Sequence, residues 1–110
     1  MPLLEQRDTR ARATGGRRDR PEVSVMRESP EARVVMYVFR PGQALPLHRS
    51  PSKVSLTVVD GTGVFTTLGR ERVVTPGDTV SYSPHEPHAM RSEEEELVVL
   101  ATIAPSPGWG

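Results

Sequence analysis

The chain has 110 residues, enough for one domain with a single modest hydrophobic core. Its 14 basic and 14 acidic residues cancel, so the net charge gives no reason to expect a nucleic acid or a membrane surface as partner. The absence of cysteine excludes disulfides and thiolate ligands, which leaves histidine, carboxylate and water as candidate ligands for a metal ion.

Residues 1–22 are predicted to form a basic, partly ordered arm. The first 20 residues contain six arginines, and the pair Gly15 and Gly16 disfavours a helix there. Because the arm has no aromatic residue to stack on a base, we interpret it as a solvated tail that could pack along a partner subunit. Residues 1–20 lack the apolar stretch of a signal peptide, and no long apolar run follows, so we expect a cytoplasmic protein.

Residues 23–104 are predicted to form a domain of short strands, followed by an irregular tail at 105–110. Eleven prolines and nine glycines indicate frequent turns, for example at residues 27–32 and 93–96. Strand propensity and apolar patterning predict strands at 23–26, 33–39, 44–48, 53–60, 64–68, 71–74, 79–83, 88–91 and 97–104. Eight or nine strands without a convincing helix predict an all-β sandwich or barrel, and a double-sheet jelly roll would limit the exposed edges.

Two of these strands carry a clear burial signal. In the segment 53–60, Val54, Leu56 and Val58 share one face, which is the period of two expected of a half-buried strand. The segment 97–104 is apolar almost throughout, so we expect it to be buried on both faces.

The stretch from Gly42 to Gly61 resembles the first sequence motif of the cupin superfamily. In that motif a glycine is followed by five residues, then His-x-His, a glutamate and a closing glycine. Here Gly42, His48 and Gly61 stand at matching positions, whereas Ser50 replaces the second histidine and Val54 replaces the glutamate.

The second half of the chain resembles the second cupin motif. Gly69, the turn at residues 76–78 and His88 follow one another in the order of that motif. The resemblance covers residues 33–103 and implies a double-stranded β-helix, that is, a jelly-roll barrel. It also implies that His48 and His88 face the interior of the barrel.

By this resemblance, His48 and His88 would bind a polar ligand group or a divalent transition metal such as zinc, iron, manganese or nickel. A serine hydroxyl is a poor metal ligand and valine is none, so a metal would be held weakly or not at all. His85 is a candidate third ligand, although its odd spacing from His88 separates the two side chains in an extended strand. A turn at Glu86 would remove that objection. The alternative that both histidines are vestigial pocket residues stays open.

Three further residues are candidates for ligand binding. Tyr82 could present its hydroxyl at the mouth of a pocket, and ordinary packing is the alternative. Arg40 and Arg49 flank the first motif and could hold a carboxylate or phosphate through paired N–H donors, although arginines at strand ends are usually solvated. No nucleophile–base arrangement of the hydrolase kind is visible, so whether the protein is an enzyme stays open.

Two functions are consistent with these residues. The first is a cupin-domain protein that binds a small polar ligand, a weakly held metal, or both. The second is a metal-dependent oxygenase or isomerase that acts on a small organic acid or sugar. In either case we expect a homodimer in which exchange of the N-terminal segment covers an edge strand, and neither a nucleic acid nor a membrane as partner.

Overall fold

The computed structural model describes residues 19–107, and this part of the chain is built from nine strands. The predicted arm therefore lies outside the described residues, except for its last four positions. Within the described span no helix is long and apolar enough to cross a membrane. The strands are β1 (Glu22–Glu28), β2 (Arg33–Phe39), β3 (Ala44–His48), β4 (Lys53–Asp60), β5 (Gly63–Thr67), β6 (Arg70–Val74), β7 (Thr79–Tyr82), β8 (His88–Ser92) and β9 (Leu97–Ala104).

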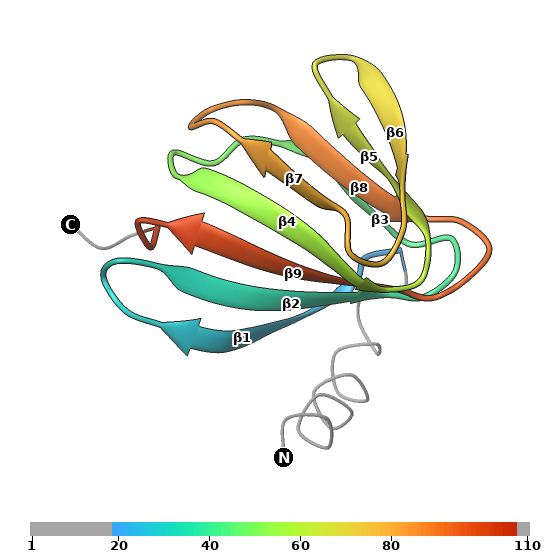
Figure 1. Ribbon diagram of the computed structural model, residues 1–110, viewed down its shortest axis with the longest axis horizontal. Coiled ribbons are helices and arrows are strands. Elements are labelled where there is room, and N and C mark those ends of the chain that lie inside the picture. Colours follow the sequence, from blue (N-terminus) through green and yellow to red (C-terminus); the bar gives the residue numbers. More distant parts are fainter. Residues whose placement is uncertain (1–18, 108–110) are drawn as a thin grey trace.

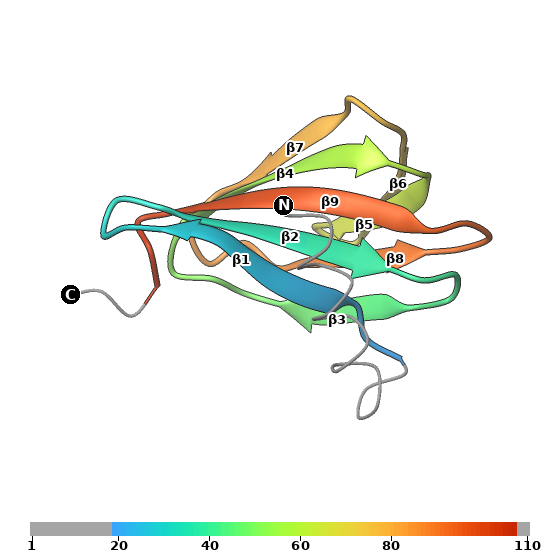
Figure 2. The same ribbon diagram turned by 90° about the horizontal axis from the view of Figure 1, so that it is seen from below.

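The strands form two antiparallel sheets that face each other. The first sheet has the order β1-β2-β9-β4-β7, and the second has the order β3-β8-β5-β6. Figure 1 shows the five strands of the first sheet side by side, and Figure 2 shows the second sheet lying against one of its faces. This double-sheet jelly roll confirms the fold class predicted from the sequence.

The core fills the space between the sheets because alternate residues of each strand point inward. Val54, Leu56 and Val58 of β4 are buried, as the alternation in this segment predicted. They pack in one cluster with buried side chains from both sheets: Val35, Phe39, Phe65, Val74, Tyr82, Met90, Leu97, Val99 and Ala101.

Four strands, β5 to β8, begin or end within one residue of their predicted bounds, and two other strands differ more from their predicted form. β1 extends to Glu28, because Glu28 pairs with Arg33 across the turn and their side chains form a 2.6 Å ion pair. The turn is therefore confined to residues 29–32. The prediction that β9 is buried on both faces is wrong: its inward residues are buried, but Val98 and Leu100 are half-buried and Thr102 is exposed on the outer face. A composition rich in valine and leucine does not by itself show how many faces are covered.

Glycine closes the end of the barrel where β4 meets β5. Gly61 has φ of +80°, and a Cβ atom there would lie 1.8 Å from the backbone oxygen of Glu96. A Cβ on Gly63 would lie 2.5 Å from a methyl carbon of Leu97 and 2.7 Å from the backbone oxygen of Arg91. At both positions, only a residue without a side chain lets β9 and the loop before it pack this closely.

The edge strand β1 leaves apolar side chains in contact with solvent. Val23 and Val25 are about half exposed, and both lie on the first strand after the predicted arm. The expected homodimer with an exchanged N-terminal segment stays a prediction, because it depends on residues 1–18, which lie outside the described part of the chain.

Candidate functional site

One row of side chains crosses the inner face of the second sheet at the start of β8. His88 is paired directly with His48 on β3 and with Thr67 on β5. Residues paired in this way in antiparallel strands carry their side chains on the same face. His88 is only 3% exposed, whereas His48 and Thr67 on either side of it are half-buried, so the row is most deeply buried at its centre.

The two imidazoles are in direct contact. Their ring centroids lie 4.2 Å apart, with an angle of 61° between the ring planes. The predicted meeting of His48 and His88 from distant parts of the chain is therefore observed, and their role as ligands stays a prediction. Because β3 and β8 are hydrogen-bonded neighbours, the sheet itself fixes this contact.

Backbone carbonyls fix the tautomer of both rings. The Nδ1 atom of His48 lies 2.9 Å from the carbonyl oxygen of Pro46, and that of His88 lies 3.0 Å from the carbonyl oxygen of Glu86. A carbonyl oxygen only accepts, so Nδ1 of each ring carries the hydrogen and donates it. In the neutral form of each ring, Nε2 then carries the lone pair and is available as a hydrogen-bond acceptor or a metal ligand.

Tyr82 on β7 forms the wall opposite the second sheet. Its ring stacks on that of His88, with centroids 4.6 Å apart and 28° between the planes. The side chain is 1% exposed, and its hydroxyl donates a long 3.4 Å hydrogen bond to the carbonyl oxygen of Thr66. Burial raises the pKa of Tyr82 to about 12, so the phenol is neutral near neutral pH. We call His48, Thr67, Tyr82 and His88 the histidine cluster.

Burial also keeps the inner imidazole neutral. Removal from water is the main cause that lowers the pKa of His88, and the neighbouring His48 acts in the same direction. The hydrogen bond to the carbonyl oxygen of Glu86 and the charge of the Glu86 carboxylate oppose this effect without cancelling it. His88 is therefore a neutral acceptor near neutral pH.

Glu86 supports the histidine cluster from the loop before β8. One carboxylate oxygen accepts the backbone N–H of Ser83 at 2.9 Å, and the other accepts the Thr67 hydroxyl at 2.8 Å. These two hydrogen bonds lower the pKa of Glu86. The carboxylate thus anchors its own loop to β5, and both of its oxygens are already in use.

The two positions at which the sequence departs from the cupin motif have structural roles. The Ser50 hydroxyl accepts the backbone N–H of Ser52 at 3.1 Å, and the Ser50 carbonyl oxygen accepts the backbone N–H of His85. Val54 is buried in the core and is paired with Tyr82 across β4 and β7. Neither residue supplies a donor atom for a metal.

The structure does not bring His85 into the histidine cluster as a third ligand. His85 is exposed and has φ of +67°, in the left-handed region, within the loop that ends before β8. Across residues 19–107, no group of three or more histidine and acidic side chains is arranged to hold a metal ion. The side chains present therefore do not fit a closed zinc centre, which takes four protein ligands, or a catalytic one, which takes three.

Arg40 lies far from the histidine pair. Its carbonyl oxygen accepts the Ser92 hydroxyl at 2.5 Å, at the opposite end of β8 from His88. Four residues of extended strand separate these ends by roughly 13 Å. Arg49 follows His48 directly and is exposed. Thr67 has no signal in the sequence, because only the register between β5 and β8 places it beside His88.

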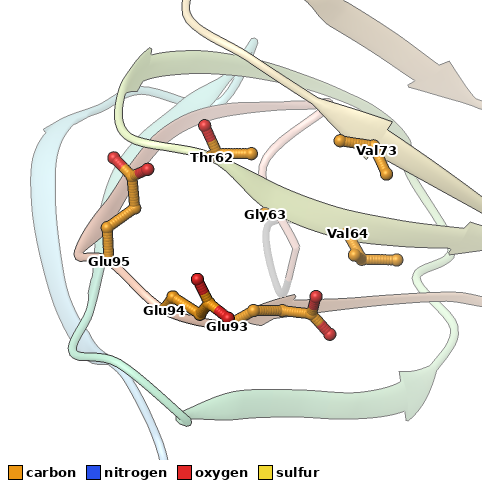
Figure 3. Close-up of a pocket in the computed structure, with 7 residues that line it drawn as sticks. All are labelled: Thr62, Gly63, Val64, Val73, Glu93, Glu94 and Glu95. Atoms are coloured by element: carbon orange, nitrogen blue, oxygen red, sulfur yellow. The ribbon is translucent and has the colours of Figure 1, made fainter.

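A surface pocket lies at that opposite end. It has a volume of about 280 Å³ and lies beyond the end of β8, as Figure 3 shows. Its lining consists of Thr62, Gly63, Val64, Val73, Glu93, Glu94 and Glu95. It shares no residue with the histidine cluster, so the two are separate features of the molecule.

Comparison with known proteins agrees with this architecture. The family model described as "Cupin domain" matches residues 35–104, which include both motif-like stretches. No curated protein matches the chain.

Solved structures with the same fold come from several bacteria. An RmlC-like cupin from Desulfovibrio desulfuricans is 27% identical with a TM-score of 0.72, over 78% of this chain and 83% of that one. A double-stranded β-helix protein from Klebsiella pneumoniae is 24% identical with a TM-score of 0.75, over 83% and 81%. The DMSP lyase DddQ from Ruegeria pomeroyi is 21% identical with a TM-score of 0.76, over 86% of this chain but 51% of that one. With the family match over residues 35–104 and its two facing sheets, the chain belongs to the cupin domain family.

Proposed function

We propose that this protein is a small-molecule-binding cupin whose barrel holds a polar organic ligand at the histidine cluster. The observation that carries the proposal is the pair of imidazoles with the same fixed tautomer, each of which directs its hydrogen to a backbone carbonyl. Two Nε2 lone pairs in adjacent rings can accept hydrogen bonds from hydroxyl, amide or amine groups of one ligand.

Burial makes such a site selective. His88 and Tyr82 are almost fully buried, so a ligand that reached them would exchange water for protein contacts on its polar groups. A ligand that fails to donate to these acceptors leaves a buried polar atom without a partner, which costs about 1–3 kcal/mol. Between them, the two rings and the Tyr82 face offer acceptors next to an aromatic surface, the usual composition of a small-molecule site.

A metal ion, if one binds, would be held by Nε2 of His48 and of His88. Two imidazoles supply only half of a four-coordinate shell, so the remaining positions would be filled by water or by the ligand. Such an ion would supply Lewis-acid character to a coordinated oxygen atom. Binding of this kind is weak, and we expect any metal to be lost during exposure to a chelator.

Ligand binding tests the proposal. Protein titrated with a panel of small polyols, amides and carboxylates should show chemical-shift changes at His48 and His88, and the double variant H48A/H88A should lose them. The variant H85A is the matched control, because its imidazole lies on an exposed loop outside the cluster. A ligand that binds H48A/H88A as tightly as the natural protein would refute the proposed site.

The second candidate function is a metal-dependent enzyme, an oxygenase or isomerase of a small organic acid or sugar, or a lyase as in the similar DddQ structure. The two Nε2 lone pairs favour it, because a neutral imidazole with Nδ1–H donated to a carbonyl is the usual form of a metal-binding histidine. Metal analysis of protein purified without added metal separates the candidates. Near-stoichiometric metal that disappears in H48A/H88A supports the enzyme, and a folded, metal-free protein supports the binding module.

A further inference from the structure

The edge strand β6 carries two arginines on its inner face. Arg70 is paired with Thr67, and Arg72 is paired with Phe65. Since Thr67 and Phe65 share a face with His88 and Met90 of β8, the side chains of both arginines leave β6 on the side that faces the barrel interior. Arg70 thereby extends the row formed by His48, His88 and Thr67.

The residue between these arginines points the other way and serves a different purpose. Glu71 faces outward, where its carboxylate accepts a 2.7 Å hydrogen bond from Arg91. Arg91 also binds Glu93 at 2.9 Å, so the guanidinium on the outer face of the second sheet is paired with two carboxylates. In contrast, within residues 19–107 no ion pair or hydrogen bond joins the side chain of Arg70 or Arg72 to another residue. The guanidinium groups of Arg70 and Arg72 on the inner face are therefore not paired with a carboxylate, whereas that of Arg91 on the outer face is.

The position of Arg72 relative to Tyr82 links it to the histidine cluster. β6 and β7 are edge strands of opposite sheets and are joined by a short turn, in which Asp78 accepts the backbone N–H of Thr75. Burial is the main cause that raises the pKa of the Tyr82 hydroxyl, and the negative charge of Glu86 adds to it; the positive charge of Arg72 offsets part of this rise. Tyr82 in turn stacks on His88.

We propose that Arg72, with Arg70 beside it, forms an anion-binding side of the histidine cluster, so that the ligand is a small organic acid. Its anionic group would pair with the Arg72 guanidinium while its polar groups meet His48 and His88. This inference rests on the proposed function and narrows its ligand class. It also replaces Arg40, which the sequence suggested as a clamp, by an arginine on the inner face.

The chemistry of the side chain suits this role. A guanidinium offers paired N–H donors that match the two oxygens of a carboxylate, and it remains charged at any physiological pH. Glu86, the acidic group nearest to the cluster in the sequence, already uses both oxygens in hydrogen bonds to Ser83 and Thr67. Because the Glu86 carboxylate is held by Ser83 and Thr67 and forms no ion pair with Arg72, an anion that reaches Arg72 would not have to displace it.

A pair of matched probes tests the proposal. Succinate and its uncharged diamide have similar size, and each is titrated into the full-length protein while the side-chain signals of Arg72, His48 and His88 are followed by nuclear magnetic resonance. We expect succinate to bind more tightly than the diamide. R72A should weaken succinate binding about tenfold or more and change diamide binding by less than about twofold. R72K should recover part of the loss.

R27A is the charge-matched control, because Arg27 is exposed on β1 at the far edge of the first sheet. Equal effects of R72A and R27A, or an equal loss for both probes in R72A, would overturn the inference, as would the absence of succinate binding.

If R72A has no effect while H48A/H88A abolishes binding, the inference fails and the proposed function stands. If R72A acts on succinate while H48A/H88A does not, the proposed function fails instead.

Discussion

The two ends of the barrel interior are built from the same strands and yet differ in kind. At the apolar end, Phe39, Val74 and Leu97 are completely buried, and Leu97 packs against Gly63. At the other end, β3, β5, β7 and β8 contribute the histidine cluster, whose two imidazole rings keep an Nε2 lone pair. The comparison shows that the strand register supplies inward positions along the whole barrel, and that the side chains at each end decide whether those positions stabilise the fold or bind a ligand.

The largest effect is expected at the apolar end, where the backbone has no room for a side chain. G61A should lower the free energy of unfolding by about 3 kcal/mol or more, because its Cβ would collide with the backbone oxygen of Glu96. G77A is the control, since Gly77 also has a positive φ but has no atom within 4 Å of the added Cβ. That variant should lose only about 1–2 kcal/mol in chemical denaturation. Equal losses would show that Gly61 is required for its dihedral angle alone.

A cavity at the apolar end should have the next largest effect. L97A should lower the free energy of unfolding by about 2–5 kcal/mol, because Leu97 is fully buried between the sheets. L47A is the matched control, since Leu47 is 62% exposed on β3 and should contribute less than about 0.5 kcal/mol. If both variants unfold at the same denaturant concentration, the apolar end does not carry the stability assigned to it.

Substitution at the histidine end should affect ligand binding more than it affects the stability of the fold. H48A/H88A should abolish ligand binding while it changes the unfolding midpoint less than L97A does, because His48 is half-buried and the pair takes no part in the apolar cluster. Parallel measurements of binding and of denaturation check this separation. A double variant that is as unstable as L97A would mean that the histidines are packing residues, the vestigial alternative raised by the sequence.

The smallest effect is a pH dependence of stability from the inner imidazole. The pKa of His88 is lowered in the folded protein, so between that pKa and the ordinary value of 6.5 the unfolded chain binds more protons than the folded one. Stability should therefore rise with pH across this window and decline as the pH falls below about 6.5. Denaturation at a series of pH values should show a shallower slope for H88N than for the natural protein.

The sequence predicted the fold well because its signals are local. Alternation in β4, the glycine turns and the spacing of Gly42 and His48 each lie within a short segment, and each indicates a strand, a turn or a motif without knowledge of its neighbours. The same reasoning failed for β9, where burial depends on what covers the outer face of the sheet rather than on the strand itself.

The candidate site was only partly predictable, because its remaining members depend on pairing between distant strands. Thr67 lies beside His88, and Arg72 faces inward, only in the observed registers of β5 with β8 and β6. A shift of one residue would turn both side chains outward. Arg40, by contrast, is close to His48 in sequence but lies at the other end of β8. Proximity along the chain was therefore a poor guide to the ligand-binding residues.

The central claim is that His48 and His88 present two Nε2 lone pairs, and nitrogen-15 spectroscopy of the imidazole rings measures this most directly. Two-bond correlations in protein labelled at histidine distinguish the tautomers of a neutral ring. Both rings should carry their hydrogen on Nδ1, and both Nε2 signals should move when a ligand or a metal ion is added. A hydrogen on Nε2 of either ring would contradict the account, because that ring could then neither accept a ligand hydrogen bond nor coordinate a metal through this atom.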